Sequence, residues 1–252
     1  MSTAISILLL HGDAEARLLA DADVAIQSMF VDREVQLIKQ WAMRPDCIDL
    51  SVPATVDSQK RPSDLVPGTD VRELLEQPHN LVIFSLLPAV TLPALRDKLG
   101  TVFLPHAGLR ASWSPEVTAR VATEYSEQPP LSPVEAARAL EPVIERLLAS
   151  GSAVAVCTTF RHVKAPLQYR RGSGMTDLRE LIRRTNFEVF CLSRRTGCFV
   201  LDFDRPLAQE GGASLNADCY GGDDRAAEIA LDEFAALLLD TIPNDFTSSE
   251  VL

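Results

Sequence analysis

The sequence predicts a three-layer α/β/α domain built on a parallel sheet of about five strands. Short apolar runs of strand length, such as residues 81–87, alternate along the chain with longer segments of helical periodicity. This alternation favours parallel strands joined by right-handed crossovers, with helices on both faces. The 252 residues, 46% of them hydrophobic, are enough to bury one large core. We expect one domain over residues 1–243 and a flexible tail over residues 244–252.

The chain opens with a predicted strand, helix and strand. Residues 5–10 are an apolar run, residues 15–30 carry apolar side chains at helical spacing, and residues 34–41 alternate apolar and polar side chains. Residues 45–68 are rich in Pro, Ser and Asp and predict a long loop.

The next elements are a short helix and the central strand. Residues 70–77 predict a helix that begins at a Thr69 or Asp70 cap. Residues 81–87 have the continuous apolar character of a strand that is covered on both faces. Residues 88–131 mix Pro, His and Trp with short apolar pieces, and we expect an irregular insertion that contains one helix near residues 115–125.

A capping box marks the next helix. Ser132 is followed by proline at the first helical position and by Glu135 at the third, so a helix is expected over residues 132–150. Pro142 lies inside it and should kink it, because proline removes a hydrogen-bond donor. Residues 153–158 are the next predicted strand.

The last third of the chain predicts one strand between two helices. The expected elements, in order, are a basic loop at 161–174, a helix at 176–194 capped by Thr176, a strand at 198–203, a loop at 205–222 and an amphipathic helix at 223–242.

The charge is unevenly distributed. The formal net charge is −11, which argues against nucleic acid as a partner, because phosphate backbones are bound by basic surfaces. Between Arg161 and Arg195, however, nine Lys or Arg residues face three acidic ones. One basic region therefore lies within an otherwise acidic protein.

Composition also bears on location. No apolar run approaches the length of a membrane helix, and the first strand lacks the basic flank and cleavage site of a secretory signal. The five cysteines have no Cys-x-x-Cys spacing, so we expect free thiols in the core and no metal site. We expect a cytoplasmic protein without a membrane partner and without a cofactor.

Four segments together resemble the SGNH/GDSL hydrolase superfamily, whose fold is flavodoxin-like, and the resemblance covers most of the chain. They are the Gly12-Asp13 turn after the first strand, the block at 78–86, the strand, loop and helix from 153 to Asn186, and the block from Val200 through Asp218 to the last helix. No single segment is specific to the superfamily, and the resemblance depends on the order of the four segments along the chain.

The resemblance also implies that catalytic residues are missing. The serine nucleophile of the family falls on Ala14, the oxyanion-hole asparagine on Ala89 and the histidine on Gly221, while the aspartate is retained as Asp218. A serine esterase needs a nucleophile, a base and oxyanion donors. This correspondence favours a catalytically reduced protein.

His11, Asp13 and Asp218 are the candidate catalytic residues. His11 ends the first strand, at the sheet edge where ligands bind in open α/β folds. Beside the two carboxylates it would form an acid–base group. The alternatives are that His11 is a satisfied strand-end histidine and that Asp13 caps the following helix.

The candidate ligand-binding residues are Gly12 and Ala14 at the turn and, in the basic loop, Arg161, His162, Lys164, Arg170 and Arg171. A loop that leaves the carboxyl end of a central strand overhangs the ligand crevice, and arginine pairs there suit phosphate or carboxylate. The alternative is an ordinary solvated loop. His79 is expected at the surface on the opposite edge, and His106 is not placed.

Three functions remain open. The first is a catalytically reduced protein that binds a small anionic or acylated ligand, or an acidic partner protein; family habits imply a bacterial glycan or natural-product pathway. The second is an esterase or acyltransferase rebuilt around His11, Asp13, Asp218 and His162. The third is a structural subunit that uses residues 88–131 as its interface.

Overall fold

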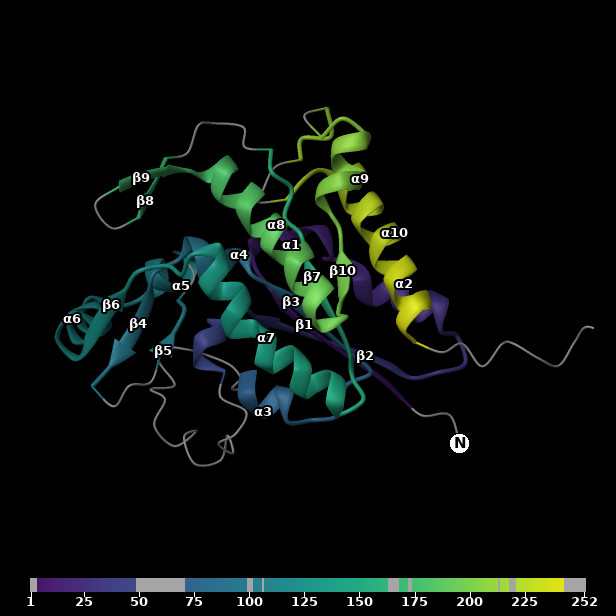
Figure 1. Ribbon diagram of the computed structural model, residues 1–252, viewed down its shortest axis with the longest axis horizontal. Helices are drawn as coiled ribbons and strands as arrows, with labels where there is room; N and C mark the ends of the chain where they lie inside the picture. Colours follow the sequence, from purple (N-terminus) through teal and green to yellow (C-terminus); the bar gives the residue numbers. More distant parts are fainter. Residues whose placement is uncertain are drawn as a thin grey trace, which may run out of the picture.

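Figure 1 shows the computed structural model of the chain. The residues that the structure describes are 4–48, 71–98, 102–105, 107–162, 168–171, 174–212, 214–217 and 221–242. The predicted caps Thr69 and Asp70, most of the predicted loop at 45–68, His106, and the tail at 244–252 lie outside these residues.

A five-stranded, fully parallel sheet forms the centre of the fold. Its strands, in spatial order, are β10 (Phe199–Leu201), β7 (Ala153–Cys157), β3 (Leu81–Ser85), β1 (Ile5–His11) and β2 (Val35–Trp41). The predicted parallel sheet is confirmed. The carboxyl ends of β1, β3 and β7 meet at one edge of the sheet, called here the carboxyl edge, and their starts meet at the opposite amino edge.

Helices cover both faces of this sheet (Figure 1). One face packs against α3 (Val71–Leu75), α4 (Leu87–Thr91), α7 (Pro133–Ala149) and α8 (Leu178–Thr196). The other face packs against α1 (Asp13–Leu18), α2 (Ala22–Met29), α9 (Asp204–Gln209) and α10 (Asp224–Thr241). The three-layer α/β/α architecture is therefore as the sequence predicts.

Alternating side chains of each central strand feed two separate cores. In β1, Leu8 and Leu10 belong to the core under α7 and α8, whereas Ile7 and Leu9 belong to the core under α2 and α10. All four are essentially inaccessible to solvent. Because successive side chains of a strand point to opposite faces, a strand buried on both sides must be apolar throughout.

The capping box at the start of α7 is confirmed. The Ser132 hydroxyl accepts a hydrogen bond of 3.1 Å from the Glu135 N–H, and the Glu135 carboxylate accepts one of 2.7 Å from the Ser132 N–H. The helix continues through Pro142, whose ring lies on the exposed side.

The single helix expected over residues 15–30 is wrong. The chain forms α1 and α2 instead, separated by a turn at residues 19–21. Lys39 of β2 donates a hydrogen bond of 3.0 Å to the carbonyl of Ala20 and pairs with Asp23 at 2.8 Å. The Lys39 side chain thus satisfies the Ala20 carbonyl at the break between the two helices. The helical spacing of residues 15–30 alone does not reveal this contact.

The insertion at residues 88–131 is more ordered than expected. The predicted helix is present as α6 (Pro115–Glu124), and two further helices, α4 and α5 (Ala107–Ser112), precede it. The same region forms a small antiparallel sheet in the order β5-β4-β6, with strands β5 (Val102–Phe103), β4 (Ala94–Asp97) and β6 (Tyr125–Gln128). Strands of two to four residues are too short to show periodicity, so the sequence pattern misses them.

Three boundaries in the last third also differ from expectation. Asp177, and not Thr176, caps α8: its carboxylate accepts a hydrogen bond of 2.8 Å from the Arg179 N–H. The basic loop contains a hairpin of β8 (Gln168–Arg171) and β9 (Gly174–Asp177). The predicted loop at 205–222 begins inside α9, a helix of six residues.

Candidate functional site

The turn after β1 lies at the carboxyl edge. Gly12 occupies the N-cap of α1, and Asp13 is exposed at its first position, so Asp13 does not serve as the cap residue. Ala14 is only 5% exposed and packs in the core. A Cβ atom at position 12 would lie 3.0 Å from Cγ of Pro88, so glycine permits the close approach of the chain after β3.

His11 is half-buried beside this turn. Its Nδ1 donates a hydrogen bond of 3.1 Å to the Gly12 carbonyl, and its ring meets that of Trp41 edge-on with 6.1 Å between the centroids. Among the described residues no carboxylate bonds to His11, and Asp218 lies outside them. The expected group of His11, Asp13 and Asp218 therefore remains a prediction.

Sequence reasoning missed Glu15, which lies directly beneath the turn. Its side chain is 1% exposed, and its carboxylate accepts hydrogen bonds from the Gly12 N–H at 2.8 Å and from the Ser85 hydroxyl at 2.9 Å. A glutamate three residues after an N-cap residue commonly accepts a hydrogen bond from the N-cap N–H. The spacing of Glu15 from Gly12 could therefore have indicated this hydrogen bond.

Cys157 ends β7 close to the same carboxylate. Burial raises the pKa of the Cys157 thiol well above its ordinary value, and the nearby charge of Glu15 raises it further. The thiol is therefore protonated and unsuited to act as a nucleophile, because the thiolate is the reactive form.

The sequence resemblance places the family's asparagine and histidine at Ala89 and Gly221, which carry no reactive side chain. Ala89 is buried in α4, where its carbonyl accepts a hydrogen bond of 3.0 Å from the Leu131 N–H. Gly221 has a φ angle of +131°, and a Cβ atom there would lie 3.0 Å from Cδ and 3.1 Å from Cβ of Arg17. The Arg17 side chain thus occupies the space into which a side chain at position 221 would extend.

The start of the basic loop follows β7 at the carboxyl edge, as expected. Asn186 of α8 holds the preceding segment through two hydrogen bonds with the Thr159 backbone, at 2.9 and 2.7 Å. The Arg161 guanidinium lies 3.5 Å from the Asp204 carboxylate. The ring centroids of His162 and Phe160 are 5.9 Å apart.

The remaining residues of the basic loop are only partly described. Lys164 lies outside the described residues. Arg170 and Arg171 belong to β8, for which the structure describes the backbone alone. The joint ligand-binding role expected for the basic loop remains a prediction.

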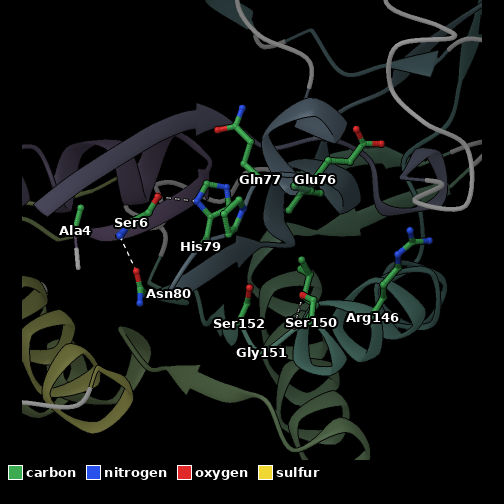
Figure 2. A pocket seen from close by; sticks show the side chains of 13 residues that line it. Ala4, Ser6, Glu76, Gln77, His79, Asn80, Arg146, Ser150, Gly151 and Ser152 are labelled. Carbon is green, nitrogen blue, oxygen red and sulfur yellow. Dashed lines mark hydrogen bonds between the residues drawn. The ribbon is translucent and has the colours of Figure 1, made fainter. Parts of the chain in front are cut away.

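A polar pocket of about 570 Å³ lies at the opposite, amino edge of the sheet (Figure 2). The expectation that His79 is a surface residue is wrong, because it lines this pocket with only 5% exposure. Its Nε2 donates a 2.7 Å hydrogen bond to the Leu74 carbonyl, and its Nδ1 accepts one of 2.9 Å from the Ser6 hydroxyl. Ser6 is 73 residues away from His79 in the chain, so the apolar pattern around His79 does not reveal this contact.

The rest of the described chain offers no further chemical site of two kinds. Within the described ranges, no cluster of three or more His, Cys, Asp or Glu side chains has the arrangement of a metal site. The helices among these residues are too short or too polar to cross a membrane.

Solved structures share this fold. The chain is similar to a mutant of Axe2, an acetyl-xylooligosaccharide esterase from Geobacillus stearothermophilus, with a TM-score of 0.51, 10% identity and 98% coverage of both chains. It is also similar to LAE5, an α/β hydrolase enzyme from the Lake Arreo metagenome, with a TM-score of 0.51, 11% identity, and coverage of 93% of this chain and 94% of that one. A G-D-S-L family lipolytic protein from Veillonella parvula gives a TM-score of 0.44 at 10% identity, over 95% of this chain and all of that one.

The sequence itself matches no protein-family model and no curated protein. The chain is thus an α/β protein whose fold is shared with the Axe2 esterase and the LAE5 hydrolase. At about 10% identity the likeness extends to the fold alone.

Proposed function

We propose that this chain is an SGNH-hydrolase-like protein that does not hydrolyse esters through the family's site and acts by binding an anionic or acylated ligand or partner. The observation that carries the proposal is the turn after β1. Ala14 stands at the position of the nucleophile and is buried, and an alanine side chain has no atom that can attack an ester.

The position of the general base supports the same conclusion. Gly221 has no side chain, and Arg17 fills the adjacent space. A nucleophile and a base must lie within hydrogen-bond reach of each other for acyl transfer. Ala14 provides no nucleophile, and Gly221 provides no base.

The ligand class follows from charge. In a protein of net charge −11, a basic segment leaves the carboxyl end of β7 and carries Arg161, His162, Lys164, Arg170 and Arg171. Guanidinium groups bind carboxylate and phosphate with two parallel hydrogen bonds. We assign this segment to the anionic part of the ligand. A bacterial glycan or natural-product pathway is the proposed setting.

The test combines turnover with binding. Purified protein is assayed with p-nitrophenyl acetate and acetylated sugars, and its melting temperature is measured with acyl-thioester and phosphorylated compounds. We expect no turnover above background and a ligand-dependent rise in melting temperature, because a ligand that binds only the folded state stabilises it. An Arg170→Ala/Arg171→Ala double variant should lose that rise, and an Arg33→Ala variant, remote on the turn before β2, should keep it.

A second candidate is an esterase or acyltransferase rebuilt around His11. The observation that favours it is the hydrogen bond from Nδ1 to the Gly12 carbonyl, because a neutral ring that donates through Nδ1 has Nε2 as its acceptor. Ester turnover that is abolished by His11→Ala would support this candidate and contradict binding alone.

We also propose a cytoplasmic location. The four cysteines among the described residues, Cys47, Cys157, Cys191 and Cys198, are free thiols. Free thiols are typical of a reducing compartment. Fractionation of cells that express the tagged chain tests this.

A further inference from the structure

We propose that the pocket at the amino edge of the central sheet binds a small polyhydroxylated carboxylate, with the size and chemistry of a sugar acid. The pocket lies where β1, β3 and β7 begin, between the turn after α3 and the end of α7 (Figure 2). Its volume of about 570 Å³ is in the usual range for small-molecule sites. The inference goes beyond the proposed function, which uses the opposite edge, and rests on it only in treating the chain as a binding protein.

Hydrogen bonds between β1 and the start of β3 hold one wall of the pocket in place. The Ser6 N–H donates to Oδ1 of Asn80, and the Asn80 N–H donates to the Ser6 carbonyl, both at 2.8 Å. His79 joins the Ser6 hydroxyl to the Leu74 carbonyl, as described above. A wall ordered before binding reduces the entropy that a ligand must offset.

This wall presents neutral groups that suit hydroxyls. Since Oδ1 of Asn80 accepts from Ser6, its Nδ2 hydrogens remain as donors, and they bond to no described residue. The Ser152 hydroxyl, on a residue that is 8% exposed, likewise has no partner within the described part of the chain. Gln77 adds a third side chain that can both donate and accept. Groups of this kind pair with hydroxyls, which also donate and accept.

The charges at the pocket favour a single carboxylate. Arg146 of α7 lines the pocket and forms no ion pair among the described residues, whereas Glu141 on the same helix is paired with Arg195 at 3.0 Å. Glu76 is the other acidic or basic side chain in the lining, and its negative charge disfavours a ligand group that carries two negative charges. His79 adds no charge near neutral pH, because burial lowers its pKa.

Calorimetric titration of the full chain tests the ligand class. The probes are D-glucuronate, D-glucose and glucose 6-phosphate. We expect saturable binding of glucuronate, at least tenfold weaker binding of glucose, which lacks the anion, and weaker binding of the phosphate, which carries more negative charge toward Glu76. Absence of glucuronate binding, or equal affinity for glucose, would overturn the proposal. Tighter binding of the phosphate would overturn the assigned carboxylate.

A pair of arginine variants locates the site. Arg146→Gln should weaken glucuronate binding by about tenfold or more. Arg138→Gln is the matched control, since Arg138 is exposed on the same helix and does not line the pocket. Equal losses in the two variants would contradict the assignment to this pocket.

Measuring ester turnover on the same preparation separates this inference from the proposed function. Ester hydrolysis together with Arg146-dependent glucuronate binding would contradict the proposed function and support the pocket. No hydrolysis and no glucuronate binding would contradict the pocket and leave the proposed function standing.

Discussion

The carboxylate of Glu15 in α1 accepts a hydrogen bond of 2.9 Å from the hydroxyl of Ser85 at the end of β3. Its second oxygen accepts a hydrogen bond of 2.8 Å from the Gly12 N–H. One buried side chain therefore connects the turn after β1 to the neighbouring strand. Burial of a carboxylate is costly unless donors compensate for lost hydration, and these two donors do so.

Removal of this carboxylate should destabilise the protein. We expect Glu15→Ala to lower the free energy of unfolding by about 2–3 kcal/mol and Ser85→Ala by about 1–2 kcal/mol, because each leaves a buried polar partner unsatisfied. Urea denaturation measures both. Glu145→Ala, at an exposed position of α7, is the control and should change stability by less than about 0.5 kcal/mol. Similar effects of Glu15→Ala and Glu145→Ala would contradict this role.

His79 should make stability depend on pH. Burial lowers the pKa of His79, and the hydrogen bond to Leu74 only partly offsets this effect. The unfolded chain, with a histidine pKa near 6.5, then binds the proton more readily than the folded chain. The contribution of neutral His79 is therefore complete above about pH 6.5 and is lost as the pH falls through its lower folded pKa.

Urea denaturation at pH 7.5 and pH 5 tests this dependence. His79→Gln should show a smaller decrease in unfolding free energy between the two pH values than the unmodified chain. His162→Gln, which changes a partly exposed ring, should retain the full decrease. An unchanged pH dependence in His79→Gln would show that another group is responsible.

Cys157 should be inert in the folded protein. Its buried thiol has a pKa well above the ordinary value, so almost no thiolate is present at pH 8. Iodoacetamide should modify the partly exposed Cys191 in the native state and reach Cys157 only after unfolding, as followed by peptide mass spectrometry. Equal rates of modification at the two cysteines in native buffer would contradict the expectation.

Serine and histidine introduced at positions 14 and 221, where the sequence resemblance places the family's catalytic residues, should not produce ester hydrolysis. Ala14→Ser supplies a hydroxyl but leaves glycine at position 221, and in the Ala14→Ser/Gly221→His double variant the new histidine side chain meets Arg17 and requires a positive φ angle. We expect no turnover of p-nitrophenyl acetate above background in either variant. The strained backbone should cost the double variant about 1–3 kcal/mol of stability. Turnover by Ala14→Ser alone would mean that a base already lies within reach.

Elements whose determinants lie close together in the sequence were predictable. The central strand β3 and the capping box of Ser132 and Glu135 at the start of α7 appear where expected, because their determinants are neighbours in the sequence. The break between α1 and α2 was not predictable, because it involves Lys39 on a later strand. The short strands β4, β5 and β6 depend on pairing partners that periodicity does not encode.

The candidate sites also depend partly on local sequence and partly on tertiary contacts. The sequence by itself determined the three-layer class, the place of the Gly12 turn at the carboxyl edge, and the presence of alanine and glycine at Ala14 and Gly221. Only the tertiary structure decided that Glu15 bonds to Ser85, that His79 is buried against Ser6, and that a polar pocket lies beside them. These partners are 70 and 73 residues apart in the chain, so sheet pairing, which brings β1 and β3 together, creates contacts that no local pattern contains.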